Sequence, residues 1–514
     1  MASMYISALT TALLLGGSHA VSAYDTLSTW SPTAVPYTGQ CGSIAADLGP
    51  GLSTNATIVL PGNSSFEALE IRSSSPRIQP TFTAIVEVAT EEDIQQTIRY
   101  ADRCDIPFLA VAGGHGWQST INNANGAIQI NMRKMQQIEL ESSGTLVRIG
   151  GGVLQRHLTQ TLYSLGKQAV TGLCECTSII GPLLGGGHSV LQGFHGFVSD
   201  NLLSARVVLA NGTAVTASAT EHPDLFWALR GAGHNFGIVA SFEVKAYDLP
   251  KTNWTIVSIV YTQDKLEEFI DALNEVDNEG DHVPELVLAG AITRIAAFDT
   301  VYPVVAYQLS YLGTADEVEP YVARFRQAGP ISVTTAENVA YNDYYIATSN
   351  GYNQTTCEED NNISGYAISL RKYNKAAVRQ TFGYFSNLTA DARYNTSVWL
   401  LESYGSRGVW AQNYSATAVA PAERNLPVLT VPITWWAGNS TEAREKAETY
   451  GKLMRAALAA GDQETSSTSH VYLNYAIGDE SREQVYGAEP LPRLQALKKR
   501  YDPANKFGFY MPLV

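Results

Sequence analysis

A single histidine lies in a glycine-rich turn that closes an apolar segment. The stretch VAGGHGWQS covers residues 111–119 and overlaps the end of the apolar PFLAVA at 107–112. An imidazole can bind a metal, move a proton or pack in a core, and it can also anchor another group. His115 therefore has four candidate roles: metal ligand, catalytic base, packed core histidine, or anchor for a covalently held group.

The cysteine content indicates a thiol that is not used in structural bridging. The chain has five cysteines, Cys41, Cys104, Cys174, Cys176 and Cys357, which cannot all pair within one chain. A disulfide between Cys174 and Cys176 would be badly strained, because only one residue separates them. The pair lacks the second cluster of a structural zinc site, so we set zinc aside.

Three glycine-rich stretches indicate close approach of the backbone to a ligand. They contain Gly113 and Gly114, residues 150–152, and the triplet Gly185, Gly186 and Gly187. Exposed N–H groups in such turns can hold phosphates, and three of them favour a large ligand with a pyrophosphate. The Walker pattern is absent, and GAGHNFG at 231–237 fits the Rossmann spacing poorly. For any single stretch, a tight turn is the simpler explanation.

The elements that carry these residues follow from local patterns. Residues 81–89 alternate as a strand, 90–104 have the capping and spacing of a helix, and 106–114 form a second strand, which makes a βαβ unit. Asn-Gly inside 204–218 predicts a hairpin. Residues 221–237 predict a short helix, followed by a strand at 238–247. From 251 to 470, strand-like and helical runs mix as in a second α+β domain, and a helix stops at Asp502-Pro503.

Length and charge restrict the class of protein. At 514 residues, two or more domains are expected, and a net charge of −15 disfavours nucleic acid or an anionic membrane as partner. Residues 1–23 resemble a signal peptide, with an apolar run and small residues at Ala20 and Ala23. With that segment, ten glycosylation sequons predict a secreted glycoprotein: Asn55, Asn63, Asn211, Asn253, Asn353, Asn362, Asn387, Asn395, Asn413 and Asn439.

Four motifs in one order resemble a known family. They are AGGHGWQ (112–118), GLCECTSIIGPLLGGGHSVLQGFHGFVSDN (172–201), HPDLFWALRGAGHNFGIV (222–239) and YLNY with YDPANKF (472–507). This order resembles FAD-linked oxidases of the vanillyl-alcohol-oxidase superfamily, in the berberine-bridge-enzyme-like branch and most like its secreted fungal members. The resemblance implies an α+β fold with an FAD-binding domain at 25–250, an inserted α+β substrate domain at 251–475, and a C-terminal return at 476–514.

The resemblance also assigns cofactor residues. His115 matches the histidine that bonds to the flavin 8α-methyl group, within a turn that includes Gly113, Gly114 and Gly116. Cys174 lies eleven residues before Gly185 and matches the cysteine that bonds to flavin C6. Ser178 stands where the family often has glycine, and Cys176 offers a second thiol, so attachment through His115 alone stays open. The expected cofactor is covalent FAD, with Gly185, Gly186 and Gly187 in its binding segment.

The same resemblance gives catalytic and structural expectations. Tyr475 matches the catalytic base of several relatives, and Asn474 matches a flavin-contacting position. A phenol needs a lowered pKa to act as a base, so nearby positive charge or flavin-linked hydrogen bonds are expected. Without the family, packing of Tyr472 and Tyr475 would be the preferred interpretation. Cys41 and Cys104 resemble a family disulfide, which leaves Cys357 without an evident partner.

Other aromatic and imidazole side chains are assigned more weakly. His188 and His195 lack metal-site spacing and are expected to be packed or to line a pocket. His234 is expected to give structural support. Trp435 and Trp436 could equally line a substrate cavity or pack in the core.

The predicted function is oxidation of a small secondary-metabolite alcohol, with hydride transfer to FAD and O2 as acceptor to give H2O2. A secreted carbohydrate oxidase is the alternative, and whether O2 or another acceptor serves is left open. A catalytically idle flavin-binding glycoprotein stays open from another class, while spacing disfavours an NAD-dependent or metal-dependent enzyme. The expected partners are a small substrate and O2, with no nucleic acid, no membrane and no metal, and we expect a monomer.

Overall fold

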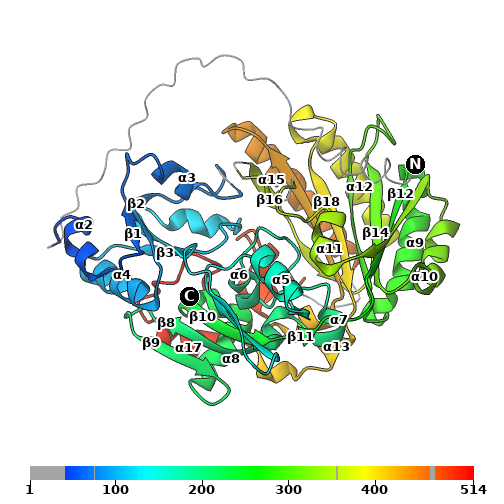
Figure 1. Cartoon of the computed structure of the whole chain (residues 1–514). Coiled ribbons are helices and arrows are strands. Elements are labelled where there is room, and N and C mark those ends of the chain that lie inside the picture. The colour runs from blue at the N-terminus through cyan, green and yellow to red at the C-terminus, as the bar shows by residue number, and fades with distance from the viewer. Residues whose placement is uncertain (1–40, 75, 355–356, 360, 463–468) are drawn as a thin grey trace.

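The computed structural model describes residues 41–74, 76–354, 357–359, 361–462 and 469–514. The signal peptide predicted at 1–23 lies outside this part of the chain. The described residues form three main sheets with helices packed around them (Figure 1). The helices and strands are both abundant, which confirms the predicted α+β class.

The first sheet has four strands in the order β1-β2-β4-β3: Thr57–Val59, Phe82–Glu87, Ala127–Asn131 and Phe108–Val111. The predicted strand, helix and strand appear as β2, α4 (Glu91–Arg103) and β3. Thr90 caps α4 through a reciprocal hydrogen-bond pair with Asp93, while the apolar face of the helix is buried. Both β2 and β3 run parallel to β4, which lies between them. The two strands of the predicted βαβ unit are therefore separated in the sheet by β4, which comes later in the chain.

The second sheet is antiparallel, with five strands in the order β5-β6-β10-β8-β9: Ile138–Leu140, Leu146–Gly150, Ile238–Lys245, Leu202–Val208 and Ala214–Ser218. The predicted hairpin is β8 and β9, and Gly212 takes a φ of +74° in its turn. Helix α8 (Pro223–Ala232) begins at a proline, as predicted. The other helices of this region are α5 (Gln155–Ser164), α6 (Ile180–Leu184) and α7 (Gln192–His195).

The third sheet has eight strands. Its order is β15-β12-β14-β13-β18-β19-β16, with β17 also paired to β19. The bounds are β12 Trp254–Tyr261, β13 Leu286–Thr293, β14 Val304–Leu312, β15 Ser332–Val339, β16 Asn362–Gly365, β17 Ile368–Leu370, β18 Val398–Tyr404 and β19 Val428–Trp436. One face packs into a core with four helices, α9 (Leu266–Asp277), α10 (Ala315–Gln327), α12 (Lys375–Thr389) and α15 (Thr441–Gly461). The opposite face of the sheet, which we call its open face, borders a cavity.

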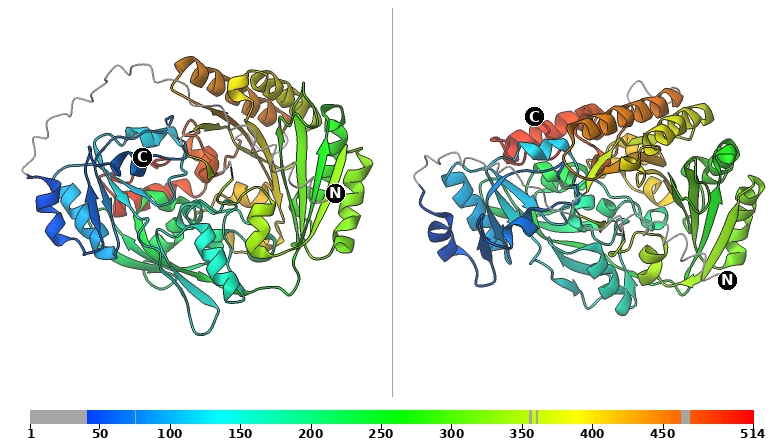
Figure 2. Two further views of the ribbon diagram at one scale, coloured as in Figure 1. Left: turned by 45° about the horizontal axis from the view of Figure 1, so that its top comes forward. Right: turned by 90° about the horizontal axis from the view of Figure 1, so that it is seen from above.

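The C-terminal segment returns to the first two sheets (Figure 2). Residues 471–514 form this segment. It includes the turn Leu473–Tyr475, just before the return expected at 476–514, and helices α16 (Arg482–Tyr486) and α17 (Leu491–Tyr501). Lys498 Nζ donates to the backbone oxygen of Asn235 at 2.9 Å, and the Phe507 ring packs edge-on to Phe108 with centroids 5.4 Å apart. The shorter elements are α2 (Ile44–Asp47), α3 (Phe66–Glu70), α11 (Tyr341–Ala347), α13 (Arg407–Trp410), α14 (Pro421–Asn425), β7 (Lys167–Gln168) and β11 (Tyr247–Asp248).

Two disulfides account for four of the five cysteines. Cys41 pairs with Cys104, which confirms the expected bridge. Cys176 pairs with Cys357, so the expectation that Cys357 lacks a partner is wrong. These residues are 181 positions apart, and nothing local in either segment indicates their pairing. Cys174 remains the free thiol.

Candidate active site

A cavity of about 540 Å³ lies between the glycine-rich segments and the open face of the eight-stranded sheet. Its lining includes the turn after β3, the segment that carries Cys174, four central strands of the large sheet, and residues of the C-terminal return. A cavity of this size can hold an organic ligand. It is the place where the segments with candidate chemistry meet.

His115 lies in this cavity on the turn between β3 and β4. The Arg133 side chain holds the turn by donating to the backbone oxygens of Ala112 (2.5 Å) and Gly113 (2.9 Å). Burial lowers the pKa of His115 to about 4, and the charges of Arg133 and Arg72 add to the shift. The imidazole is therefore neutral near pH 7, with a nitrogen lone pair available for bonding.

Cys174 lines the same cavity, and the turn that carries His115 packs directly against its segment. A Cβ on Gly113 would lie 2.7 Å from the backbone nitrogen of Ser178, so only glycine permits this approach. Burial raises the pKa of the Cys174 thiol to about 12, with a contribution from the Glu402 charge. The thiol therefore keeps its proton, and its sulfur lies 3.8 Å from Asn350 Oδ1.

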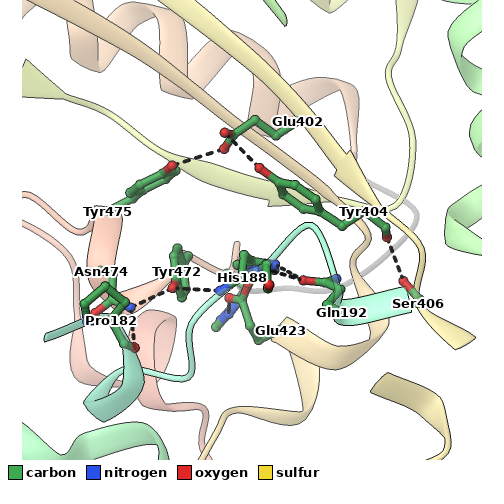
Figure 3. A network of polar contacts seen from close by, with 12 residues as sticks. Pro182, His188, Gln192, Glu402, Tyr404, Ser406, Glu423, Tyr472, Asn474 and Tyr475 are labelled. Carbon is green, nitrogen blue, oxygen red and sulfur yellow. Dashed lines mark hydrogen bonds and ion pairs between the residues drawn. The ribbon is translucent and has the colours of Figure 1, made fainter. Parts of the chain in front are cut away.

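Tyr475 faces the carboxylate of Glu402, which was not a candidate from the sequence. Its hydroxyl donates to Glu402 Oε2 at 3.2 Å, and the Tyr404 hydroxyl donates to Glu402 Oε1 at 3.0 Å (Figure 3). All three line the cavity. Burial raises the pKa of Tyr475 well above its ordinary value of 10, and the Glu402 charge raises it further. A positive charge was expected beside Tyr475 to lower its pKa. The structure instead places a proton acceptor there, the carboxylate of Glu402.

Glu402 combines a buried position with an ionisable group. Burial raises its pKa above the ordinary 4.5, while the Tyr404 hydrogen bond and the charge of His188 oppose that shift. The signal available in the sequence was an acidic residue inside the apolar strand VWLLESY at 398–404, because buried carboxylates need partners and are rare.

The predicted glycines and Asn474 divide into two groups. Gly113, Gly114, Gly116 and Asn474 line the cavity, whereas residues 185–187 are not part of its lining. A Cβ on Gly185 would come within 2.2 Å of Asn474 Oδ1, so this glycine makes room for the asparagine. Asn474 Nδ2 donates to the backbone oxygen of Pro182 at 2.9 Å and to the Tyr472 hydroxyl at 2.6 Å. The triplet thus supports a residue that reaches the cavity.

A buried cluster of ionisable groups adjoins the cavity. Glu423 accepts hydrogen bonds from His188 Nε2 at 2.6 Å and from His470 Nε2 at 2.5 Å. His188 lines the cavity, and its Nδ1 contacts Gln192 Oε1 at 2.9 Å (Figure 3). Burial alone would raise the pKa of Glu423, but the two histidines hold it at about 2. His188 was a candidate from the sequence, whereas Glu423 and His470 were not.

The remaining candidates separate between the cavity and the core. His234 lines the cavity, with its ring stacked on Tyr510 at 4.3 Å between centroids. His195 stacks on Tyr247 outside the lining. Trp435 lines the cavity, whereas Trp436 packs in the core beneath the large sheet.

Several features of the lining fit a bound FAD. Gln155 Oε1 and His234 Nδ1 are buried on the cavity wall without a hydrogen-bond partner among the described residues. Such atoms are costly unless a ligand or water meets them. His115 and Cys174 add two side chains capable of bonding to carbon. In the described part of the chain, no group of His, Cys, Asp and Glu has the arrangement of a metal site.

Comparison with protein families agrees with this cofactor. Residues 82–218 match the family model described as FAD binding domain, and residues 471–511 match the one described as berberine and berberine like. The FAD-linked oxidoreductase chyH of Penicillium rubens is 34% identical over 91% of this chain and 93% of the relative. The FAD-linked oxidoreductase chry5 of Gibberella zeae is 34% identical over 91% and 94%.

Solved structures share the fold at lower identity. BBE-like 1 of Physcomitrella patens has a TM-score of 0.77 at 20% identity, covering 92% of this chain and 100% of that chain. Xylooligosaccharide oxidase from Myceliophthora thermophila has a TM-score of 0.75 at 22% identity, covering 92% and 99%. Glucooligosaccharide oxidase from Acremonium strictum, with a 6-S-cysteinyl, 8α-N1-histidyl FAD, has a TM-score of 0.75 at 19% identity, covering 92% and 99%.

The fold and the family matches define a flavoprotein enzyme, an FAD-linked oxidoreductase. Within that class, the chain belongs to the berberine-bridge-enzyme-like family. Both the predicted family and the two-domain vanillyl-alcohol-oxidase type of fold are confirmed. Among the described helices, none combines the length and the apolar character that a membrane crossing requires.

Proposed function

We propose that this enzyme is a covalently flavinylated oxidase that removes a hydride from a small secondary-metabolite alcohol and passes the electrons to O2. The observation that carries the proposal is the Tyr475–Glu402 pair, which faces the same cavity as His115 and Cys174. His115 and Cys174 would hold FAD. When bound, FAD supplies a two-electron acceptor that takes the substrate hydride and delivers the electron pair to O2 as H2O2.

The residues of the chain would move the proton. The Tyr475 hydroxyl donates to Glu402, so its oxygen can accept the proton of the substrate hydroxyl while its own proton passes to the carboxylate. The raised pKa of Glu402 suits this role, because burial makes the protonated form acceptable. The substrate loses one proton to this pair and one hydride, and it becomes a carbonyl compound.

We also propose how FAD is attached, how the chain divides into domains and where the protein is located. The histidyl and cysteinyl FAD of the Acremonium strictum oxidase supports bicovalent attachment here through His115 and Cys174. We assign FAD binding to residues 25–250 and 476–514, and substrate binding to 251–475. Two disulfides favour an oxidising compartment, in keeping with a secreted, glycosylated monomer.

Substitution of the pair tests the proposed chemistry. We expect Tyr475→Phe and Glu402→Gln each to slow flavin reduction by an oxidisable alcohol about 10²–10⁴-fold, with flavin content unchanged. Wild-type activity should fall as pH falls through the raised pKa of Glu402, because the protonated acid cannot accept the Tyr475 proton. Stopped-flow absorbance and a peroxide assay across pH provide the measurement.

Tyr404→Phe is the matched control, because it removes one hydrogen bond to Glu402 and leaves Tyr475 in place. We expect the fall in activity at low pH to occur at a higher pH in this variant than in wild type. Its maximal rate should fall less than the rates of Tyr475→Phe and Glu402→Gln. A Tyr475→Phe enzyme with the wild-type rate would remove the base assignment. Yellow protein that releases no peroxide with any alcohol or sugar would instead be a catalytically idle flavin-binding glycoprotein.

A further inference from the structure

The open face of the eight-stranded sheet forms the substrate side of the cavity. Side chains alternate along a strand, so every second residue of the central strands points into the cavity. Those residues are mainly aliphatic or aromatic, and they include Val287, Ala289, Ala291, Leu400, Ile433 and Trp435. The intervening residues pack into the core beneath the sheet. The wall is therefore apolar over several adjacent strands.

The centre of this wall is a floor of three apolar side chains, two of which are alanines. Ala291 lies opposite Ala306 on one neighbouring strand and opposite Leu400 on the other. All three side chains are only partly buried, and all three line the cavity. Trp435, from β19, also lines this side. Two alanines side by side leave a flat area, which suits the face of a ring system.

Most polar groups on this face already have partners within the protein, and Trp435 Nε1 is a buried donor that has none among the described residues. Thr293 Oγ1 donates to the backbone oxygen of Ser397 at 3.1 Å, and Gln308 Nε2 donates to Ser258 Oγ at 3.1 Å. Ser310 hydrogen-bonds to Tyr344. Few donors and acceptors are thus left for the hydroxyl groups of a ligand, and buried hydroxyls without partners oppose binding.

The charge on this face comes from one residue, which lies next to the floor in the strand register. Glu402 is the one charged side chain that these strands contribute to the lining within the described residues, and both of its oxygens accept tyrosine hydroxyls. On this face, a substrate would therefore meet a proton-accepting group beside Tyr475 and a mainly apolar surface around it.

Resting on the proposed oxidase function, we propose that the substrate is a largely apolar, ring-bearing alcohol and not a sugar oligomer. Its ring system lies on the floor formed by Ala291, Ala306 and Leu400, and its single hydroxyl reaches Tyr475 and Glu402. A sugar oligomer would bring many hydroxyls against a face that offers them few partners. The inference separates the two substrate classes that the sequence left open.

Ligand binding to the holoenzyme tests this inference. The probes are 2-naphthalenemethanol and cellobiose, titrated while tryptophan fluorescence and flavin absorbance are followed, and peroxide is assayed in parallel. We expect saturable binding of 2-naphthalenemethanol at least tenfold tighter than that of cellobiose. Ala291→Asp places a charge on the floor and should weaken the naphthyl probe at least tenfold. Leu400→Gln serves as a milder second variant if Ala291→Asp does not fold.

Thr335→Asp is the matched control, because it adds the same charge at an exposed position on edge strand β15 of the same sheet. It should leave both affinities unchanged. Cellobiose binding as tight as that of the naphthyl probe, or unchanged naphthyl affinity in both floor variants, overturns the inference. Tight naphthyl binding without peroxide from any alcohol contradicts the oxidase proposal but leaves the preference of this face for apolar rings standing. Peroxide from cellobiose alone contradicts the inference and leaves the oxidase activity standing.

Discussion

Two side chains with bonding chemistry share one cavity, and both are held in their neutral forms. His115 is neutral because burial and two arginine charges lower its pKa to about 4. Cys174 keeps its proton because burial and Glu402 raise its pKa to about 12. The histidine can bond as it stands, whereas the thiol must first lose a proton, so we expect the histidyl bond to form without help from the cysteine.

Acid precipitation of single and double variants tests whether the histidyl bond forms without the cysteine. We expect wild-type protein, Cys174→Ala and His115→Ala to give yellow pellets, and the double variant to give a colourless one, because no covalent bond then holds the flavin. Mass spectrometry of flavin peptides should place the bonds at the two residues. His157→Ala, on α5 and outside the cavity lining, is the control and should match wild type. A yellow pellet from the double variant would show a different attachment site.

At this scale the sequence identified the residues with recognisable family motifs and missed those defined by distant contacts. His115, Cys174 and Tyr475 were predicted, and the structure brings them to one cavity. Glu402 was missed because its partner Tyr475 lies 73 residues away, and pairing across that distance depends on the folded chain. The same holds for Glu423 and its two histidines.

At the scale of elements, the disulfide between Cys176 and Cys357 ties the segment of Cys174 to the chain after α11. Backbone contacts reinforce this tie, because Glu175 N–H donates to the oxygen of Asn350 at 3.1 Å and Tyr352 N–H donates to Glu175 Oε2 at 2.8 Å. Residues 348–350 and Gln354 line the cavity. The bridge thereby fixes part of the cavity wall.

Removal of this bridge should loosen the wall and destabilise the fold. We expect the Cys176→Ser, Cys357→Ser double variant to lose about 2–4 kcal/mol of unfolding free energy, since a long loop is no longer closed. Affinity for cavity ligands should fall as well. Urea unfolding and ligand titration are the measurements. The Cys41→Ser, Cys104→Ser variant should lose stability with ligand affinity retained, because that bridge lies outside the lining. Equal ligand affinities in both variants would contradict the role of the Cys176 bridge.

Local elements were predictable where capping and periodicity decide them, as for α4 and the β8–β9 hairpin. Strand order was not, because β4 enters between β2 and β3 through parallel pairing that no local pattern encodes. The partner of Cys357 was hidden for a similar reason. The strand order and the partner of Cys357 both depend on contacts between residues that are far apart in the chain.

At the scale of the whole molecule, Glu423 connects three distant parts of the chain. It lies on α14 and binds His188, which follows the glycine triplet, and His470, which precedes the C-terminal return. Each of the three side chains is about 95% buried. Removing one partner from such a group leaves the others without compensation, which is strongly destabilising.

Glu423→Gln should therefore lower the free energy of unfolding by about 3 kcal/mol or more at neutral pH. The pKa of Glu423 is about 2 in the folded chain and near 4.5 when unperturbed, so its contribution is complete above pH 4.5 and is lost as pH falls towards 2. The difference between wild type and variant should shrink over that window in urea unfolding. Exposed Glu445→Gln should show no such difference. A difference constant with pH would refute a contribution from the charge of Glu423.

The return of the C-terminal segment has a consequence for how the enzyme is made. Residues of this segment, among them Asn474 and Tyr475, complete a cavity whose other walls come from earlier parts of the chain, from Arg72 to Trp435. Since a ribosome delivers the C-terminus last, a nascent chain carries the turn of His115 and the segment of Cys174 before the cavity can close. We therefore expect flavin to be loaded only once the polypeptide is finished, so that a chain interrupted before Asn474 should be released without bound flavin.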